Sequence, residues 1–434
     1  MTRALLLLAA ALVSPPAAAQ TVAIVNGTVA LGDGSQPIPN GTVVFRDGRI
    51  VAAGANVPAP AGATVIDAAG KWVAPGTVAA FTDLGLVDGG YGVPENNDAN
   101  ATNTPFGASV DVAPAINPAA VPIGNERLGG VTRAFVAPRA DDYIFAGQGA
   151  VIDLGNDPDP VTRARAFQFV EMGERGAVIA GGSRPATYAA LRDAFAQALD
   201  YRRDPSGFDG RGRDSLLKRA DAQALLDVLD GRTPLLVHAE RASDIRTVLA
   251  LPREHPKLRL VLLGAGEGWM VAREIGAARV PVIAAALADL PSSFEQIAAT
   301  ESNVGRLTQA GVTVAISTVG ANTAPGEHIL NQYAGNLVAI SKVPGATGLT
   351  WGQAFATITS KPAEALGMAD EIGSLRPGRR ADVVIWSGDP LELASAPEAV
   401  WIDGHRQPST SRQRQLRDRY MTPTEGELPK AYSR

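Results

Sequence analysis

The chain contains no cysteine, so neither a disulfide bond nor a lipid anchor on cysteine can contribute to it. It has no basic stripe: 39 Lys and Arg face 44 Asp and Glu, and the net charge is −5, which argues against a nucleic-acid-binding protein. Charged residues make up 19% and apolar residues 46%, a balance typical of a globular chain rather than a disordered one. With 434 residues, the chain is long enough for a large core and for more than one domain.

The one long apolar run lies at the N-terminus, from Ala4 to Val13, and it is too short to span a bilayer. Arg3 precedes it, and small residues ending at Ala19 follow it, which predicts a signal peptide over residues 1–19. The alternative is a buried helix. We therefore expect a periplasmic or secreted bacterial protein that is stabilised by burial alone.

Short alternating runs interrupted by turns predict β-strands near both ends of the chain. They lie at 22–26, 41–54 and 63–67, and again at 372–386 and 399–404. Either set alone would leave open sheet edges. We therefore predict that residues 20–75 and 371–406 pair into one small β-sandwich domain, followed by a polar tail over 407–434.

Strand-like and helical segments alternate between these two ends. The predicted strands are 77–83, 131–136, 150–154, 177–180, 234–238, 259–263, 280–284 and 312–317, and helical segments include 188–201, 215–229, 242–249 and 293–298. This alternation predicts a (β/α)8 barrel, an α/β fold, over residues 76–370. The segment 87–124 has little periodicity and follows the first strand, so it is expected to be a lid or a disordered loop.

Three motifs resemble the imidazolonepropionase-like members of the amidohydrolase superfamily. They are Val-Ala-Pro-Gly-Thr-Val-Ala-Ala-Phe-Thr-Asp over 73–83, Leu-Val-His-Ala-Glu-Arg-Ala-Ser-Asp-Ile over 236–245, and Gly-Ser-Leu-Arg-Pro-Gly-Arg-Arg-Ala-Asp-Val-Val-Ile-Trp over 373–386. The resemblance implies the barrel with its small domain. It also implies metal-assisted hydrolysis of a C–N bond, in a cyclic amide or a dipeptide-like substrate.

The residues that carry the chemistry in that family are mostly replaced. The six positions correspond to Phe81 and Asp83 on the first strand, Val178 on the fourth, His238 on the fifth, Gly264 on the sixth and Val319 on the eighth. One position is kept, His238, and Asp83 is a replacement candidate. A metal lowers the pKa of bound water from about 15.7 to about 7, a change that corresponds to a free energy on the order of 12 kcal/mol. A lone general base lowers the activation free energy by roughly 3–5 kcal/mol. A surviving acid or base therefore does not replace the metal.

His238 and Asp83 are the candidate catalytic residues, and Phe81, Glu240 and Glu267 the candidate substrate-binding residues. The structural alternatives are that His238 is simply bonded to Asp83 or Glu240, that Asp83 binds backbone amides, and that Glu267 caps a helix beginning near residue 269. The other histidines are expected in loops or facing solvent. They are His255, His328 and His405, and only His328 could reach the barrel mouth.

Two functions fit these observations. The first is a binding or accessory protein without a metal or other cofactor, which takes a small-molecule ligand and pairs with a catalytically complete paralogue or with itself. The alternative is an active hydrolase with a sparse site that uses Asp83 and His238, with or without one divalent metal such as zinc.

Overall fold

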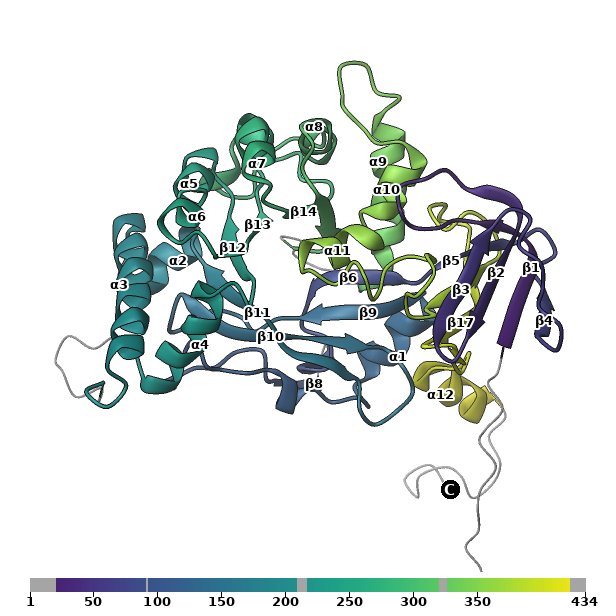
Figure 1. Ribbon diagram of the computed structural model, residues 1–434, viewed down its shortest axis with the longest axis horizontal. Coiled ribbons are helices and arrows are strands. Elements are labelled where there is room, and N and C mark those ends of the chain that lie inside the picture. The colour runs from purple at the N-terminus through teal and green to yellow at the C-terminus, as the bar shows by residue number, and fades with distance from the viewer. Residues whose placement is uncertain (1–20, 91–92, 209–216, 320–325, 422–434) are drawn as a thin grey trace, which may run out of the picture.

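The computed structural model describes residues 21–90, 93–208, 217–319 and 326–421, and it contains two large sheets (Figure 1). The predicted signal peptide lies outside these ranges. The first sheet consists of β6 (Thr77–Thr82), β9 (Val131–Val136), β10 (Phe145–Asp153), β11 (Val161–Glu171), β12 (Leu235–Ala239), β13 (Leu260–Gly264), β14 (Val282–Ala285) and β15 (Val314–Ser317). Its order is β15-β14-β13-β12-β11-β10-β9-β6, and β15 returns to contact β6, so the sheet forms a nearly closed barrel. The predicted α/β barrel is confirmed.

Helices follow most of these strands. They are α1 (Val121–Leu128), α2 (Glu174–Ile179), α3 (Arg184–Arg203), α4 (Arg219–Leu229), α5 (Ala242–Val248), α6 (Leu251–Glu254), α7 (Ala272–Ala278), α8 (Asn303–Gln309), α9 (Leu330–Ile340), α10 (Trp351–Ala356), α11 (Ser360–Ala365) and α12 (Arg412–Met421). The segment 293–298, predicted to be helical, contains only the 3-10 turn η3 (Phe294–Gln296). No helix within the described ranges is both long and apolar enough to cross a membrane.

The fourth barrel strand was placed wrongly by the sequence. Residues 177–180 belong to α2 and to its C-cap rather than to a strand, and the side chain of Val178 is 76% exposed. The strand in that position is β11, which ends at Glu171 and pairs with β12 in parallel. A four-residue apolar run does not distinguish a strand from one face of a short helix, which explains the error.

β10 runs antiparallel to both of its neighbours, so the barrel wall is not entirely parallel. The chain passes from β9 to β10 to β11 without a helix. The segment 98–120 packs there instead: the amide of Gln148 on β10 donates to the carbonyl of Val110 at 2.7 Å, and the amide of Val112 donates back at 3.2 Å. Residues of this segment, such as Ala108 and Ile116, belong to the main core. The described part of the long segment, which also carries the hairpin β7 (Val87–Gly90) and β8 (Val93–Asn97), therefore forms part of the barrel's covering.

The second sheet combines strands from both ends of the chain and is here named the terminal sheet. Its members are β1 (Thr21–Val29), β2 (Ile38–Arg46), β3 (Arg49–Gly54), β4 (Thr64–Asp67), β5 (Trp72–Pro75), β16 (Val383–Trp386), β17 (Pro397–Ile402) and β18 (His405–Arg406). β5 and β16 pair antiparallel and join the N-terminal strands to the C-terminal ones. All eight strands belong to one hydrogen-bonded sheet that encloses a core of its own, rather than to two separate sheets. It lies beside β9 and α1, at the opposite end of the molecule from α3 (Figure 1).

A fully buried arginine joins this sheet to the barrel. Arg133 on β9 donates to both oxygens of Asp382 at 2.7 and 2.9 Å, and it lies 2.9 Å from a carboxylate oxygen of Asp403. A carboxylate oxygen of Asp153 lies 3.7 Å from its third nitrogen. Burial raises the pKa of Asp153 to about 6, because the nearby guanidinium offsets only part of that cost. The polar tail predicted after residue 406 includes the exposed helix α12.

Candidate functional site

The carboxyl ends of β11, β12 and β13 bring three positions together at the barrel mouth. Glu171 and His238 are register partners on adjacent parallel strands, and Gly264 follows on β13. His238 Nδ1 lies 2.7 Å from Glu171 Oε1, and its Nε2 lies 3.0 Å from Glu240 Oε1. The imidazole is 19% exposed, whereas both carboxylates are buried. The fourth strand therefore does supply a polar residue, Glu171, which the misplacement of that strand concealed.

This contact sets the charge of His238. Burial lowers the pKa of its imidazole, but the adjacent carboxylates of Glu171 and Glu240 outweigh burial and raise that pKa well above 6.5. Burial alone would raise the pKa of Glu240. The hydrogen bond and charge of His238, together with the other hydrogen bonds to this carboxylate, have the larger effect, so the pKa of Glu240 lies below its usual value. The two carboxylates therefore favour the protonated imidazole, which can donate an N–H to each of them.

Glu240 also fills the space beside Gly264, where the family's histidine on the sixth strand would lie. A Cβ at position 264 would stand 2.4 Å from Glu240 Oε1 and 2.9 Å from His238 Cδ2, and the glycine has a φ of +85°. The other oxygen of Glu240 accepts a hydrogen bond from the amide of Gly266 at 2.6 Å. A histidine at 264 has no room unless Glu240 moves.

These residues do not fit a metal centre of the family's kind. A metal ligand must present a lone pair to the metal, and both ring nitrogens of His238 instead face carboxylate oxygens at hydrogen-bond distance. Across the described ranges, no three His, Asp or Glu side chains form a group that could hold a metal ion.

The first strand contributes an aromatic and an acidic residue. The ring of Phe81 contacts Phe169 on β11 edge-to-face, with the ring centroids 5.1 Å apart. Asp83 forms an ion pair with Arg139, which follows β9. No hydrogen bond joins Asp83 to His238 in the described structure: Asp83 pairs with Arg139, and His238 pairs with Glu171 and Glu240.

Glu267 caps a helix, but not the one predicted. Its carboxylate accepts from the amide of Ala242, the first residue of α5, at 3.0 Å, and from the amide of Ala298 at 3.2 Å. Its side chain does not cap the 3-10 turn that follows it, η2 (Gly268–Val271), where the amide of Trp269 donates instead to Asn303 Oδ1 at 2.9 Å. Glu267 thus joins α5 to the loop after β14.

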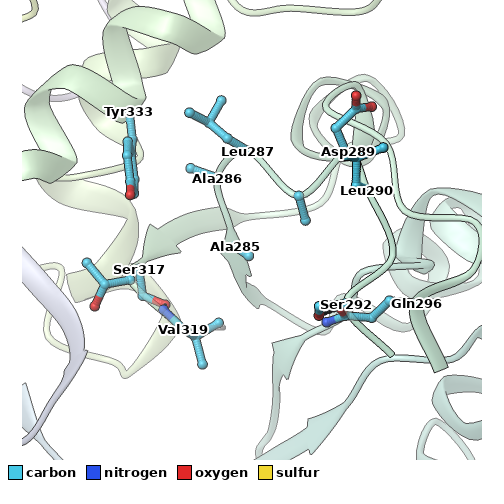
Figure 2. A pocket seen from close by; sticks show the side chains of 12 residues that line it. Ala285, Ala286, Leu287, Asp289, Leu290, Ser292, Gln296, Ser317, Val319 and Tyr333 are labelled. Carbon is cyan, nitrogen blue, oxygen red and sulfur yellow. Dashed lines mark hydrogen bonds between the residues drawn. The ribbon is translucent and has the colours of Figure 1, made fainter. Parts of the chain in front are cut away.

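A cavity of about 510 Å³ opens at the carboxyl ends of β14 and β15 (Figure 2). Its lining comprises Ala285, Ala286, Leu287, Ala288, Asp289, Leu290, Ser292, Gln296, Ser317, Thr318, Val319 and Tyr333. Val319, which replaces the family's aspartate on the eighth strand, lies in the cavity wall. Gln296 also hydrogen-bonds to Glu240, so it connects the cavity to the His238 cluster.

A second acidic cluster lies beside this cavity. Thr318 Oγ1 donates to Glu327 Oε1 at 3.0 Å, and the other oxygen of Glu327 is buried and has no hydrogen-bond partner among the described residues. Burial, with the nearby carboxylates of Glu126 and Asp83, raises the pKa of Glu327 to about 8. The hydrogen bond of His328 to Glu126 raises the pKa of that imidazole. No motif in the sequence marks Glu327 as a functional residue.

The two other histidines lie away from this site. The ring of His255, which ends α6, contacts Phe195 edge-to-face, with the centroids 5.2 Å apart. His405 is exposed on β18 of the terminal sheet.

Replacing Glu327 with glutamine is expected to remove part of the pH dependence of stability. The folded protein keeps this proton up to about pH 8, whereas the unfolded chain releases it near 4.5, so the free energy of unfolding falls as the pH rises between these values. We compare the free energy of unfolding of Glu327→Gln with that of the parent protein at each pH. This difference should favour the variant by roughly 2–4 kcal/mol more at pH 8 than at pH 5. Urea denaturation at the two pH values measures this difference. The exposed Glu398→Gln serves as the control, and an equal effect of Glu327→Gln at both pH values would contradict the prediction.

The chain belongs to the amidohydrolase family, whose sequence profile matches residues 186–406. It is 25% identical over 405 residues to the imidazolonepropionase of Mesorhizobium japonicum, covering 86% of this chain and 92% of that protein. It is also 25% identical over 402 residues to the amidohydrolase tasK of Hapsidospora irregularis, covering 85% of this chain but 40% of that longer protein. A crystal structure of an amidohydrolase from Thermotoga maritima superposes with a TM-score of 0.77 at 25% identity, over 89% of this chain and 99% of the other. The imidazolonepropionase-like resemblance predicted from the motifs is confirmed.

Proposed function

We propose that this protein binds a small molecule at the barrel mouth without a catalytic metal, and that it acts as a binding or accessory subunit instead of a metal-dependent hydrolase. Hydrolysis of C–N bonds is the activity that family membership makes plausible, and this chain retains the scaffold for it. The observation that carries the proposal is the state of His238, whose two ring nitrogens are both bound to carboxylates. The proposal includes export through residues 1–19 and a catalytically complete paralogue, or a second copy of the chain, as the partner.

The magnitudes favour this function over metal-assisted hydrolysis. A bound metal contributes on the order of 12 kcal/mol by acidifying water, and roughly 3–5 kcal/mol comes from a positioned general base. The carboxylates of Glu171 and Glu240 favour a protonated His238, which cannot accept a proton from water, and both carboxylates are occupied in binding it. Catalysis that depended on this cluster would first have to disrupt it.

A second candidate is a hydrolase with a sparse site. The observation that favours it is that His238 remains partly accessible beside two carboxylates, one of which ends the strand where the family carries a bridging residue. In this case Asp83 would have to act from a separate position, since its partner is Arg139. Measuring the metal content and the charge of His238 separates the two candidates.

Protein produced in zinc-supplemented medium is expected to retain far less than stoichiometric zinc after dialysis. The imidazole of His238 is expected to keep its second proton to a higher pH than an imidazole in solution does, as nitrogen-15 NMR of labelled histidine would show, because the two carboxylates stabilise its charge. His238→Ala assigns the signal, and His405→Ala on the exposed β18 is the matched control. Stoichiometric zinc that is lost in His238→Ala and retained in His405→Ala would overturn the proposal and support the sparse hydrolase.

A further inference from the structure

We propose that the cavity at the ends of β14 and β15 binds an uncharged small molecule with an aryl or branched alkyl group, anchored by the hydroxyl of Tyr333. This inference rests on the proposed function, and it names the class of ligand. A cavity of about 510 Å³ lies within the usual range of small-molecule pockets, roughly 300–1,000 Å³. It is large enough for one ring that carries a short substituent.

The wall of this cavity is apolar and made of small residues. Ala285 and Ala286 end β14 and begin the following loop, where larger side chains would fill the space. Leu287 and Val319 extend the apolar surface on either side (Figure 2). An aryl or alkyl group placed against this wall gains about 25 cal/mol for each Å² of apolar surface removed from water.

The cavity offers a charged ligand little compensation. Among the residues that the structure describes, its lining contains no lysine or arginine. The one carboxylate is that of Asp289, which is exposed and lies at the rim on the side opposite Tyr333 (Figure 2). Desolvating a charge costs several kcal/mol unless a partner offsets it, so the lining selects against anions and favours neutral molecules.

Most polar groups of the lining are already paired. Thr318 donates to Glu327, and the hydroxyl of Ser317 accepts from the amide of Val319 at 3.2 Å. Gln296 accepts from Ser292 at 2.6 Å. Each of these groups holds the cavity wall in place.

The hydroxyl of Tyr333, by contrast, has no hydrogen-bond partner among the described residues. Tyr333 lies on α9, and its hydroxyl points toward the end of β15 (Figure 2). It is the polar group of the cavity best placed to bond a ligand carbonyl.

The entrance supports the same class of ligand. Three large apolar side chains are exposed on the segment that follows β14: Leu290 at 82%, Phe294 at 85% and Ile297 at 63%. Leu290 lines the cavity, and the other two are neighbours in sequence of Gln296. Leu290 is the one of these three that lines the cavity, so it provides an exposed apolar side chain there that an apolar ligand group can contact.

Three probes of similar size and different charge test this inference: acetanilide, phenylacetate and phenethylammonium. Isothermal titration of the full chain should show the tightest binding for neutral acetanilide. Ala285→Phe fills the cavity and should weaken acetanilide at least tenfold. Tyr333→Phe removes one hydrogen bond and should weaken it about fivefold to tenfold. Tyr143→Phe, the same change in a different cavity, is the control and should bind as the parent does.

Each outcome decides one claim. Preference for phenylacetate or phenethylammonium would overturn the neutral ligand class, and so would the absence of binding by all three probes. Binding that is unchanged in Ala285→Phe would overturn the location, provided that the thermal melt shows that this variant folds. If Ala285→Phe does not fold, Ala286→Val is the smaller filling change, and it should weaken acetanilide in the same direction. Stoichiometric zinc together with acetanilide binding in this cavity would refute the metal-free function and leave the ligand class standing.

Discussion

Replacing Arg133 with methionine is expected to lower the free energy of unfolding by about 3–5 kcal/mol. The guanidinium is fully buried and holds the carboxylates of Asp382 and Asp403, with that of Asp153 nearby. Without it, the carboxylates of Asp382 and Asp153, which are 5% and 8% exposed, remain buried with no positive partner. Because Asp382 and Asp403 belong to the terminal sheet and Arg133 to the barrel, the loss should also loosen the two parts. Guanidinium chloride denaturation measures the change.

Arg246→Met is the matched control for this experiment. Arg246 forms an ion pair with Glu274 on the surface, where its side chain is 54% exposed. A surface pair of this kind contributes about 0–1 kcal/mol. Equal stability losses in Arg133→Met and Arg246→Met would show that the buried cluster does not join the barrel to the sheet.

Deleting residues 372–434 is expected to abolish folding. The deletion removes β16, which pairs with β5 along Val383 and Ile385, and it removes Leu375 and Trp401 from the core of the terminal sheet. Each such buried side chain contributes about 1.5–3 kcal/mol, so these four alone amount to roughly 6–12 kcal/mol. That sum is comparable to the whole stability of a domain, about 5–15 kcal/mol. The shortened protein should aggregate or show no cooperative melt in circular dichroism.

Deleting only residues 407–434 is the control. The described part of this tail, residues 407–421, contains the exposed helix α12 and no member of the core clusters. The shorter deletion should leave solubility and melting unchanged. A soluble, cooperatively melting protein that lacks residues 372–434 would mean that the two ends of the chain fold independently.

The barrel was predictable wherever a strand carried both an apolar run and a family motif. β12 and β13 were identified in this way, and so was β6 with its Pro-Gly turn. The fourth strand was missed because β11 begins with alternating arginines, whereas a short apolar run in α2 looked more like a buried strand. The antiparallel direction of β10 had no local signal, since direction depends on which neighbours a strand pairs with.

The candidate site was predictable in part. The histidine of the β12 motif and the glycine of β13 were placed correctly, and the pairing of His238 with Glu240 was one of the alternatives considered. The pairing with Glu171 was not considered, because that residue lies 67 positions away in a strand that had been misplaced. Asp83 looked like a partner for His238 from the sequence, but Arg139 holds it elsewhere.

By itself the sequence determined what the site lacks. The side chains at positions 81, 264 and 319 have no donor atoms for a metal, and no folding of the chain can change that. Only the tertiary structure decided what surrounds His238. Two carboxylates from different segments meet one imidazole where β11, β12 and β13 end side by side, and burial strengthens their interaction. The charge of His238 depends on the short distances between its ring nitrogens and these two carboxylates. The spacing of residues along the sequence does not predict those distances.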